Sequence, residues 1–218
     1  MEITQIYTRF RIPKNLQLHH FRVAAVGKYL CDHWDSAIDK KSVIETLLLH
    51  DLGNLLKFDL NRGIMLLDQS ERDLNYWKKI QQDMKSQYGD DEHVATYKMA
   101  QEIVASPRVL DILSRMGSSN LEKTIQSSDT EVKICSYADM RVSPDGFVTV
   151  EERFADILRR YAHRNHVLAD EQKTLFKKEL CLQLEKQIQA NCDTDVVVFS
   201  EKEAQEILKT LRNYSFSL

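Results

Sequence analysis

The stretch SVIETLLLHDLG at residues 42–53 joins an apolar helix to two side chains that are hard to bury. Ser42 and Glu45 match a capping box, which predicts that the helix begins here, and the final glycine is a typical helix end. His50 falls on the apolar face of this helix, and Asp51 follows it directly. We therefore expect an imidazole and a carboxylate to meet at the end of a buried helix.

Other predicted helices also carry an ionisable residue in register with apolar ones. A single inward histidine is most often a core residue bonded to a carbonyl group, and that alternative stays open for each. An inward aspartate needs a cation, because burying an unpaired carboxylate costs several kcal/mol. Converging imidazoles and carboxylates suit a divalent transition metal. The aligned sets are His19 with Val23, Val26 and Leu30; Asp139 with Val132, Cys135 and Val142; and His93 with Tyr97, Ala100 and Val104.

Composition and helix punctuation both predict an all-α fold. Only six glycines and three prolines occur in 218 residues, whereas sheet-rich folds need many turns. A short β-like run, DVVVF, at residues 195–199 interrupts the predicted helices. The predicted helix starts and caps are Asn15, Ser42, Ser70, Asp90 or Asp91, Ser106 with Pro107, Asp129, Thr149 with Glu152, and Ser200 with Glu203.

The overall charge and the cysteines exclude several classes of protein. A net charge of -3 argues against general affinity for nucleic acid. The four cysteines form no CxxC pair, which argues against a zinc knuckle or a disulfide framework. No apolar run is long enough for a membrane span, and the first residues do not resemble a signal peptide. We expect a cytoplasmic protein that has no membrane partner.

The chain divides into a main domain and an extension. We predict a domain over residues 1–166 and a helical extension over residues 167–218. In the extension, Phe176, Leu180, Leu184 and Ile188 form a single stripe, which is expected to pack on the domain or on a partner. A homodimer formed through this stripe is one alternative.

Three motifs together resemble the HD-domain superfamily of metal-dependent phosphohydrolases. That family has a histidine on one helix, a consecutive His-Asp pair on a second and an aspartate on a late helix. The matching stretches are LHHFRVAAV, LLLHDLGNLLKFD and SYADMRVSPDG, and the resemblance covers roughly residues 8–165. It implies an HD-domain-like helical bundle with extra helices at its C-terminal end.

The resemblance also implies a ligand set and a reaction. The implied metal ligands are His19, His50, Asp51 and Asp139. One divalent ion (Mn, Fe, Co, Zn, Ni or Mg) would polarise a phosphoryl oxygen and lower the pKa of a bound water. By analogy Asp51 also contacts that nucleophile, and His93 is a candidate general acid or a ligand to a second ion. Asn54 departs from the family, since many members have Lys or an acidic residue there.

A phosphorylated substrate needs cations near the metal. Sequence proximity to the proposed ligands selects Arg141 as the best candidate, because arginine binds phosphate in a bidentate manner. The other predicted substrate-binding residues are Lys57, Arg22 and Lys98.

The expected function is hydrolysis of a phosphomonoester, either a nucleotide or another small phosphorylated metabolite. One alternative from a different class is a regulatory interaction module that has no catalysis, with or without a metal. A two-metal phosphodiesterase and a di-iron oxygenase are further alternatives. No second histidine follows His93 closely, which favours one ion over two.

Overall fold

The structure is a computed structural model that describes residues 1–63, 67–103, 105–161, 170–199 and 201–216. Within these residues the protein is all-α apart from one short antiparallel hairpin, as the sequence predicts. The hairpin strands are β1 (Val142–Ser143) and β2 (Gly146–Phe147), and the 3-10 turns are η1 (Asn54–Lys57) and η3 (Gln69–Glu71). The helices are α1 (Ile3–Arg9), α2 (Lys14–Asp32), α3 (Lys40–Leu49), α4 (Leu60–Gly63), α5 (Leu74–Tyr88), α6 (Glu92–Glu102), α7 (Pro107–Arg115), α8 (Leu121–Gln126), α9 (Thr130–Met140), α10 (Val150–Tyr161), α11 (Glu171–Gln189) and α12 (Glu201–Leu211).

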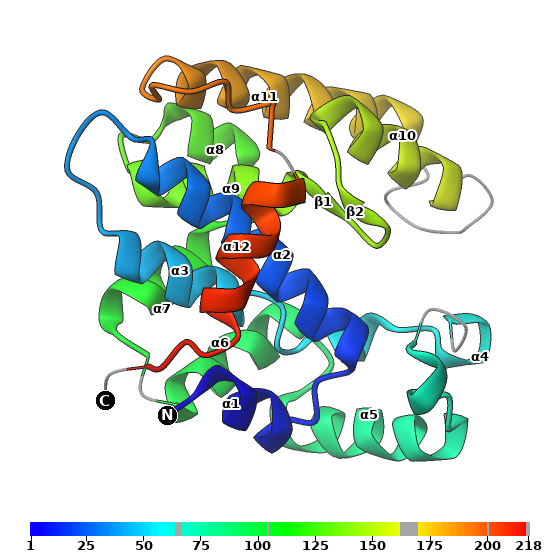
Figure 1. Cartoon of the computed structure of the whole chain (residues 1–218). Coiled ribbons are helices and arrows are strands. Elements are labelled where there is room, and N and C mark those ends of the chain that lie inside the picture. Colours follow the sequence, from blue (N-terminus) through cyan, green and yellow to red (C-terminus); the bar gives the residue numbers. More distant parts are fainter. Residues whose placement is uncertain (64–66, 104, 162–169, 200, 217–218) are drawn as a thin grey trace.

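Helix α2 lies at the centre of the molecule, in contact with α3, α9 and α12 (Figure 1). Helix α3 also packs against α7 and α9, so its apolar residues are buried on every side. Gly27 lets α2 and α3 approach closely, because a Cβ at this position would collide with the side chain of Leu47. The close approach brings the end of α3 next to the middle of α2.

Several predicted helix caps are present. Asp91, Ser106 and Asp129 each accept a hydrogen bond from a backbone N–H in the first turn of α6, α7 and α9 respectively. Thr149 and Glu152 form the reciprocal pair of a capping box at the start of α10. These caps set where α9 and α10 begin, and therefore the direction of the side chains that they carry.

Other helix starts differ from the predictions. Helix α2 begins at Lys14 after Pro13, so Asn15 is not its cap. Helix α3 is capped by Asp39, whose carboxylate accepts from Ser42 N–H, and the predicted serine cap lies inside the helix. Helix α5 is capped by Asp73, three residues after the predicted start. Helices α2 and α3 thus begin upstream of the predicted residues, and α5 begins downstream. Helices α1 and α8 were not predicted.

The C-terminal helices pack on the same core. Leu184 and Ile188 of the predicted stripe are buried, whereas the side chain at its other end, Phe176, is 53% exposed. The predicted strand at residues 195–199 is irregular chain instead. The amino group of Met1 donates a hydrogen bond to the carbonyl of Phe216, so the first and last described residues lie side by side. The proposed boundary at residue 166 and the predicted cap at residue 200 lie outside the described residues.

Two further predictions concern the whole chain. All four cysteines are free and buried, which confirms that they form no disulfide framework. Among the helices that the structure describes, none is both long enough and apolar enough to cross a membrane.

Candidate metal centre

Three helices bring His19, His50 and Asp139 together. His19 lies on α2, His50 follows the last residue of α3, and Asp139 lies near the end of α9. One ligand atom from each side chain falls within 4.8 Å of the other two. Nε2 of His19 lies 3.4 Å and Nε2 of His50 lies 3.5 Å from Oδ1 of Asp139. This group could hold a metal ion.

Asp51 lies beside this three-residue group. Its Oδ2 is 3.8 Å from Nε2 of His19 and 3.7 Å from Nε2 of His50. Asn54 donates a hydrogen bond from Nδ2 to the same Oδ2, at 2.7 Å. The residue that departs from the family pattern therefore orients the carboxylate of the His-Asp pair.

The hydrogen bonds of His50 fix which ring nitrogen faces the centre. Nδ1 lies 2.8 Å from the carbonyl oxygen of Leu47, and a carbonyl can only accept, so Nδ1 carries the proton and donates it. Nε2 is buried and has no hydrogen-bond partner among the described residues. A buried nitrogen lone pair without a donor, facing two carboxylates, fits a metal ligand. The residues present therefore fit a divalent ion.

The charges of the centre depend on each other. Burial lowers the pKa of His50, but Asp51 and Asp139 outweigh burial and raise it to about 9. Burial raises the pKa of Asp139, but the adjacent imidazoles of His19 and His50 hold it well below its usual value. Without an ion, a proton on His50 thus supplies the positive charge that the two carboxylates require. A metal ion and this proton compete for the same nitrogen.

His20, next to His19 on α2, also faces the interior. Its ring is fully buried between Tyr7 and His50, with centroid distances of 5.3 and 5.2 Å. Neither ring nitrogen makes a hydrogen bond within the described protein. Burial, His50 and His19 together lower the pKa of His20 well below its usual value, which keeps this ring neutral.

The turn that follows Asp51 is held against α6. Gly53 N–H donates to Oγ1 of Thr96 at 2.9 Å. A Cβ at Gly53 would lie 2.9 Å from the Ala95 Cβ and 3.0 Å from the Thr96 nitrogen, so only glycine allows this approach. The contact places η1 and the first turn of α6 next to the metal centre.

Charged residues of η1 and α6 form a series of ion pairs next to the metal centre. Lys57 Nζ lies 2.9 Å from Oε1 of Glu92, and the same oxygen is 3.3 Å from Nε2 of His93. Burial lowers the pKa of Lys57, but the charges of Asp51, Glu92 and Asp139 raise it above its usual value. The positive charge of Lys57 is therefore stabilised by Glu92 and by the two carboxylates of the metal centre. The side chain of His93 is 66% exposed, which corrects the prediction that it faces inward.

The hydrogen-bond donors of Arg141 are occupied by groups of the protein and do not face a substrate site. Its guanidinium donates to the carbonyls of Val148 and Val197 at 2.7 Å each, to the carbonyl of Val196, and to the Tyr137 hydroxyl at 2.6 Å. The residue is only 4% exposed. This arrangement corrects the sequence prediction, which relied on proximity along the chain to Asp139.

Two other predicted substrate contacts are directed elsewhere. Lys98 donates from Nζ to the Tyr88 carbonyl at 3.2 Å and so caps the end of α5. Arg22 donates to the Pro144 carbonyl of the hairpin turn at 3.3 Å. For the fourth predicted cation, Lys57, Asp51 and Asp139 act to raise the pKa.

The sequence analysis missed Arg153. This residue lies on α10, three residues after Val150 and four before Ile157, and both of those are buried. The helical spacing therefore indicated an inward side chain, and the side chain is 14% exposed. Burial lowers the pKa of Arg153, while Asp139 and Asp51 act to raise it. The charges of two proposed metal ligands thus act on Arg153.

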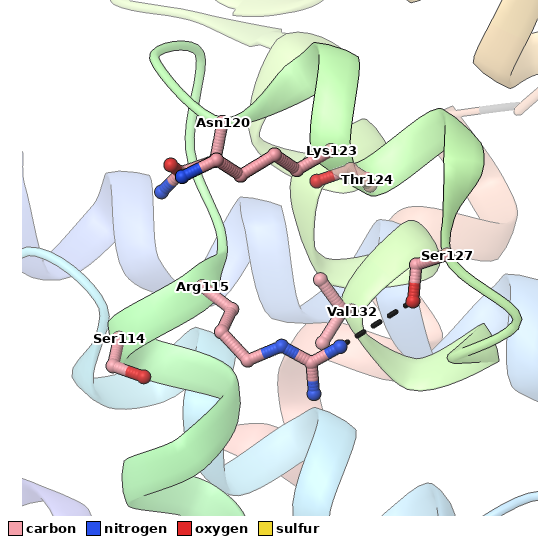
Figure 2. Close-up of a pocket in the computed structure, with 7 residues that line it drawn as sticks. All are labelled: Ser114, Arg115, Asn120, Lys123, Thr124, Ser127 and Val132. Atoms are coloured by element: carbon pink, nitrogen blue, oxygen red, sulfur yellow. Dashed lines mark hydrogen bonds between the residues drawn. The ribbon is translucent and has the colours of Figure 1, made fainter.

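A separate cavity of about 150 Å³ lies between α7, α8 and α9 (Figure 2). Arg115 lines it and donates to Ser127 Oγ at 3.3 Å, but the same guanidinium also pairs with Asp111 and Asp129. No histidine or carboxylate lines this cavity. It therefore offers no alternative metal site.

The group of His19, His50 and Asp139 is the main indication of function. Comparisons of the chain with models of known families, with curated proteins and with solved structures returned no match.

Proposed function

We propose that the protein is a metal-dependent phosphohydrolase of the HD type that acts on a small phosphomonoester. The observation that carries the proposal is the group of His19, His50 and Asp139, in which Nε2 of His50 is buried and unpaired. Asp51, 3.7 and 3.8 Å from the two histidines, is the proposed fourth ligand. Two imidazoles and two carboxylates suit a divalent transition ion.

The chemistry that such an ion supplies is activation of water and neutralisation of phosphoryl charge. The protein residues would do the rest. Nδ1 of His50 is held by the Leu47 carbonyl, which keeps the ring in the orientation that a ligand needs. Asn54 holds the Asp51 carboxylate, which we propose also orients the attacking water. Lys57 would attract the anionic substrate to the centre.

His93 is the proposed proton donor to the leaving oxygen. It is exposed, so it can meet a substrate that enters from solvent, and it contacts Glu92 at the edge where Lys57 lies. One ion is the proposed content, because the grouping comprises three ligands and the adjacent Asp51. A second ion would require His93 to turn inward.

The first test is the metal content of the purified protein, measured by elemental mass spectrometry. We expect about one divalent ion per chain in the wild type and none in His50→Ala, because that variant loses a ligand nitrogen. His33→Ala is the matched control. His33 also pairs with a carboxylate, Asp193 at 2.8 Å, but lies outside the grouping. Loss of metal in His33→Ala, or its retention in His50→Ala, would contradict the proposed site.

The second test is turnover of a panel of phosphomonoesters and phosphodiesters by the metal-loaded protein. We expect release of phosphate from monoesters, and its loss in Asp51→Ala. A protein that holds metal and hydrolyses nothing would support the interaction module instead. Two ions per chain together with diester cleavage would support the two-metal alternative.

A further inference from the structure

Arg153 lies on α10, a part of the chain that the HD-type motifs do not include. The hairpin that follows Asp139 contacts α2, α9 and α10. Helix α10 buries Val150, Phe154 and Ile157, and the side chain of Arg153 shares that inner face. The fold thus places a largely buried cation next to the hairpin that joins α9, which carries Asp139, to α10.

Among the described residues, the guanidinium of Arg153 has only a distant ion-pair partner, Asp156. Its Nε is buried and makes no hydrogen bond within the described residues. Its Nη1 lies 3.9 Å from Oδ2 of Asp156, which is too long for a hydrogen bond. Asp156 already has closer partners, Arg159 at 2.9 Å and Arg160 at 2.7 Å. A largely buried cation in this state is unfavourable unless another anion completes its surroundings.

Besides Asp156 on its own helix, carboxylates of the metal centre act on Arg153. Asp139 and Asp51 favour its charged form, but neither forms an ion pair with it among the described residues. Lys57, on η1, responds to the same two carboxylates. Two cations from separate elements therefore lie around one metal site. When an ion neutralises the two carboxylates, Arg153 is available to a further anion, and Lys57, whose partner is Glu92, can add a second positive charge.

We infer that Arg153 binds the phosphoryl group of the substrate, with Lys57 as a second cation, and that the pair selects a dianionic phosphomonoester. This inference rests on the proposed function. The charge of a divalent ion cancels the charges of Asp51 and Asp139. Arg153 and Lys57 therefore determine whether a dianion or a monoanion binds more tightly. A dianion gains more from them than the single charge of a diester does. The planar guanidinium offers paired N–H donors to two phosphoryl oxygens.

Binding of small phosphate compounds to the metal-loaded full-length protein tests the inference. Isothermal titration calorimetry with inorganic phosphate, methyl phosphate and dimethyl phosphate measures affinity without any need for turnover. We expect Arg153→Gln to retain its metal and to bind phosphate at least tenfold more weakly. Arg159→Gln is the matched control, because Arg159 lies on the same helix, pairs with the same Asp156 and is 74% exposed. It should bind phosphate as the wild type does.

The outcomes separate the two proposals. Unchanged phosphate affinity in a folded, metal-loaded Arg153→Gln would overturn the role of Arg153 and leave the hydrolase proposal standing. A wild-type protein that binds metal but no phosphate would overturn both. Equal affinity of the wild type for methyl and dimethyl phosphate would overturn the selection of a dianion. If Arg153→Gln does not fold, Arg153→Lys decides: weakened phosphate binding supports the role, and wild-type binding overturns it.

Discussion

At the scale of single residues, the contact between Asn54 and Asp51 restricts the orientation of a proposed metal ligand. A carboxylate with two histidines at 3.7 and 3.8 Å can rotate toward either, and the 2.7 Å hydrogen bond from Asn54 restricts that rotation. Outer contacts of this kind orient a metal ligand before the ion arrives. Asn54 therefore has a positioning role in the proposed site.

The corresponding prediction concerns Asn54→Ala. We expect metal affinity to fall by about 10- to 100-fold, because the Asp51 carboxylate loses its orienting donor. Competition with a chelator of known affinity measures the change. Asn61→Ala, at an exposed position on α4, is the control and should retain wild-type affinity. Equal affinities for the two variants would show that Asn54 does not position the carboxylate.

Helical periodicity identified the residues that meet at the centre but not all of their neighbours. His19, His50 and Asp139 each stand in register with apolar residues, and the structure brings them together. Arg141 was chosen because it lies close to Asp139 in sequence, whereas Arg153 had the correct helix face. Proximity along the chain is a weak guide here, since the hairpin after α9 reverses the direction of the chain.

At the scale of helices, Asp129 holds the start of α9 and two neighbouring cations. Its carboxylate accepts the N-cap hydrogen bond from Val132 N–H. The same carboxylate receives Arg108 and Arg115 at 2.6 Å each. These partners, Arg108 first, outweigh burial and hold the pKa of Asp129 well below its usual value. The cap thereby fixes the helix that carries Asp139.

We predict that Asp129→Asn lowers the free energy of unfolding by about 1–3 kcal/mol at neutral pH. Because folding depresses this pKa, the stabilisation is complete above the unfolded value of about 3.9 and disappears as the pH falls further. The difference between variant and wild type should therefore shrink below about pH 4. Urea unfolding across that range measures it.

Asp111→Asn is the control for this prediction. Asp111 contacts the same two arginines, but its side chain is 44% exposed. Its loss should change the unfolding free energy by less than about 1 kcal/mol. Asparagine keeps an N-cap acceptor, so a pH-independent defect in Asp129→Asn would contradict the role of the Asp129 charge.

The helix starts show where local sequence is insufficient. A serine with a glutamate three residues later predicted the start of α3, but Asp39 lies upstream and caps it first. Asp73 likewise caps α5 in place of Ser70, which lies in the short η3 turn. A capping motif shows that a residue is able to begin a helix. Which of several candidates does so depends on the tertiary contacts of the segment before it.

At the scale of the whole molecule, Arg141 joins three segments that are far apart in sequence. It lies at the end of α9 and donates to Val148 beyond the hairpin. It also donates to the carbonyls of Val196 and Val197, between α11 and α12. The sequence analysis treated the C-terminal helices as a separate extension, because no local pattern marks a buried arginine as their anchor.

Replacement of this anchor gives the final prediction. Arg141→Met leaves buried carbonyl acceptors without donors, so we expect the unfolding free energy to fall by about 2–4 kcal/mol. Amide exchange near residues 196–199 should accelerate more than exchange in α2, because the C-terminal segment loses its attachment first. The folded variant should keep its metal and its phosphate affinity. Arg159→Met, at an exposed position, should change neither stability nor exchange. A loss of phosphate binding at unchanged stability would instead return Arg141 to the substrate site, where sequence proximity had placed it.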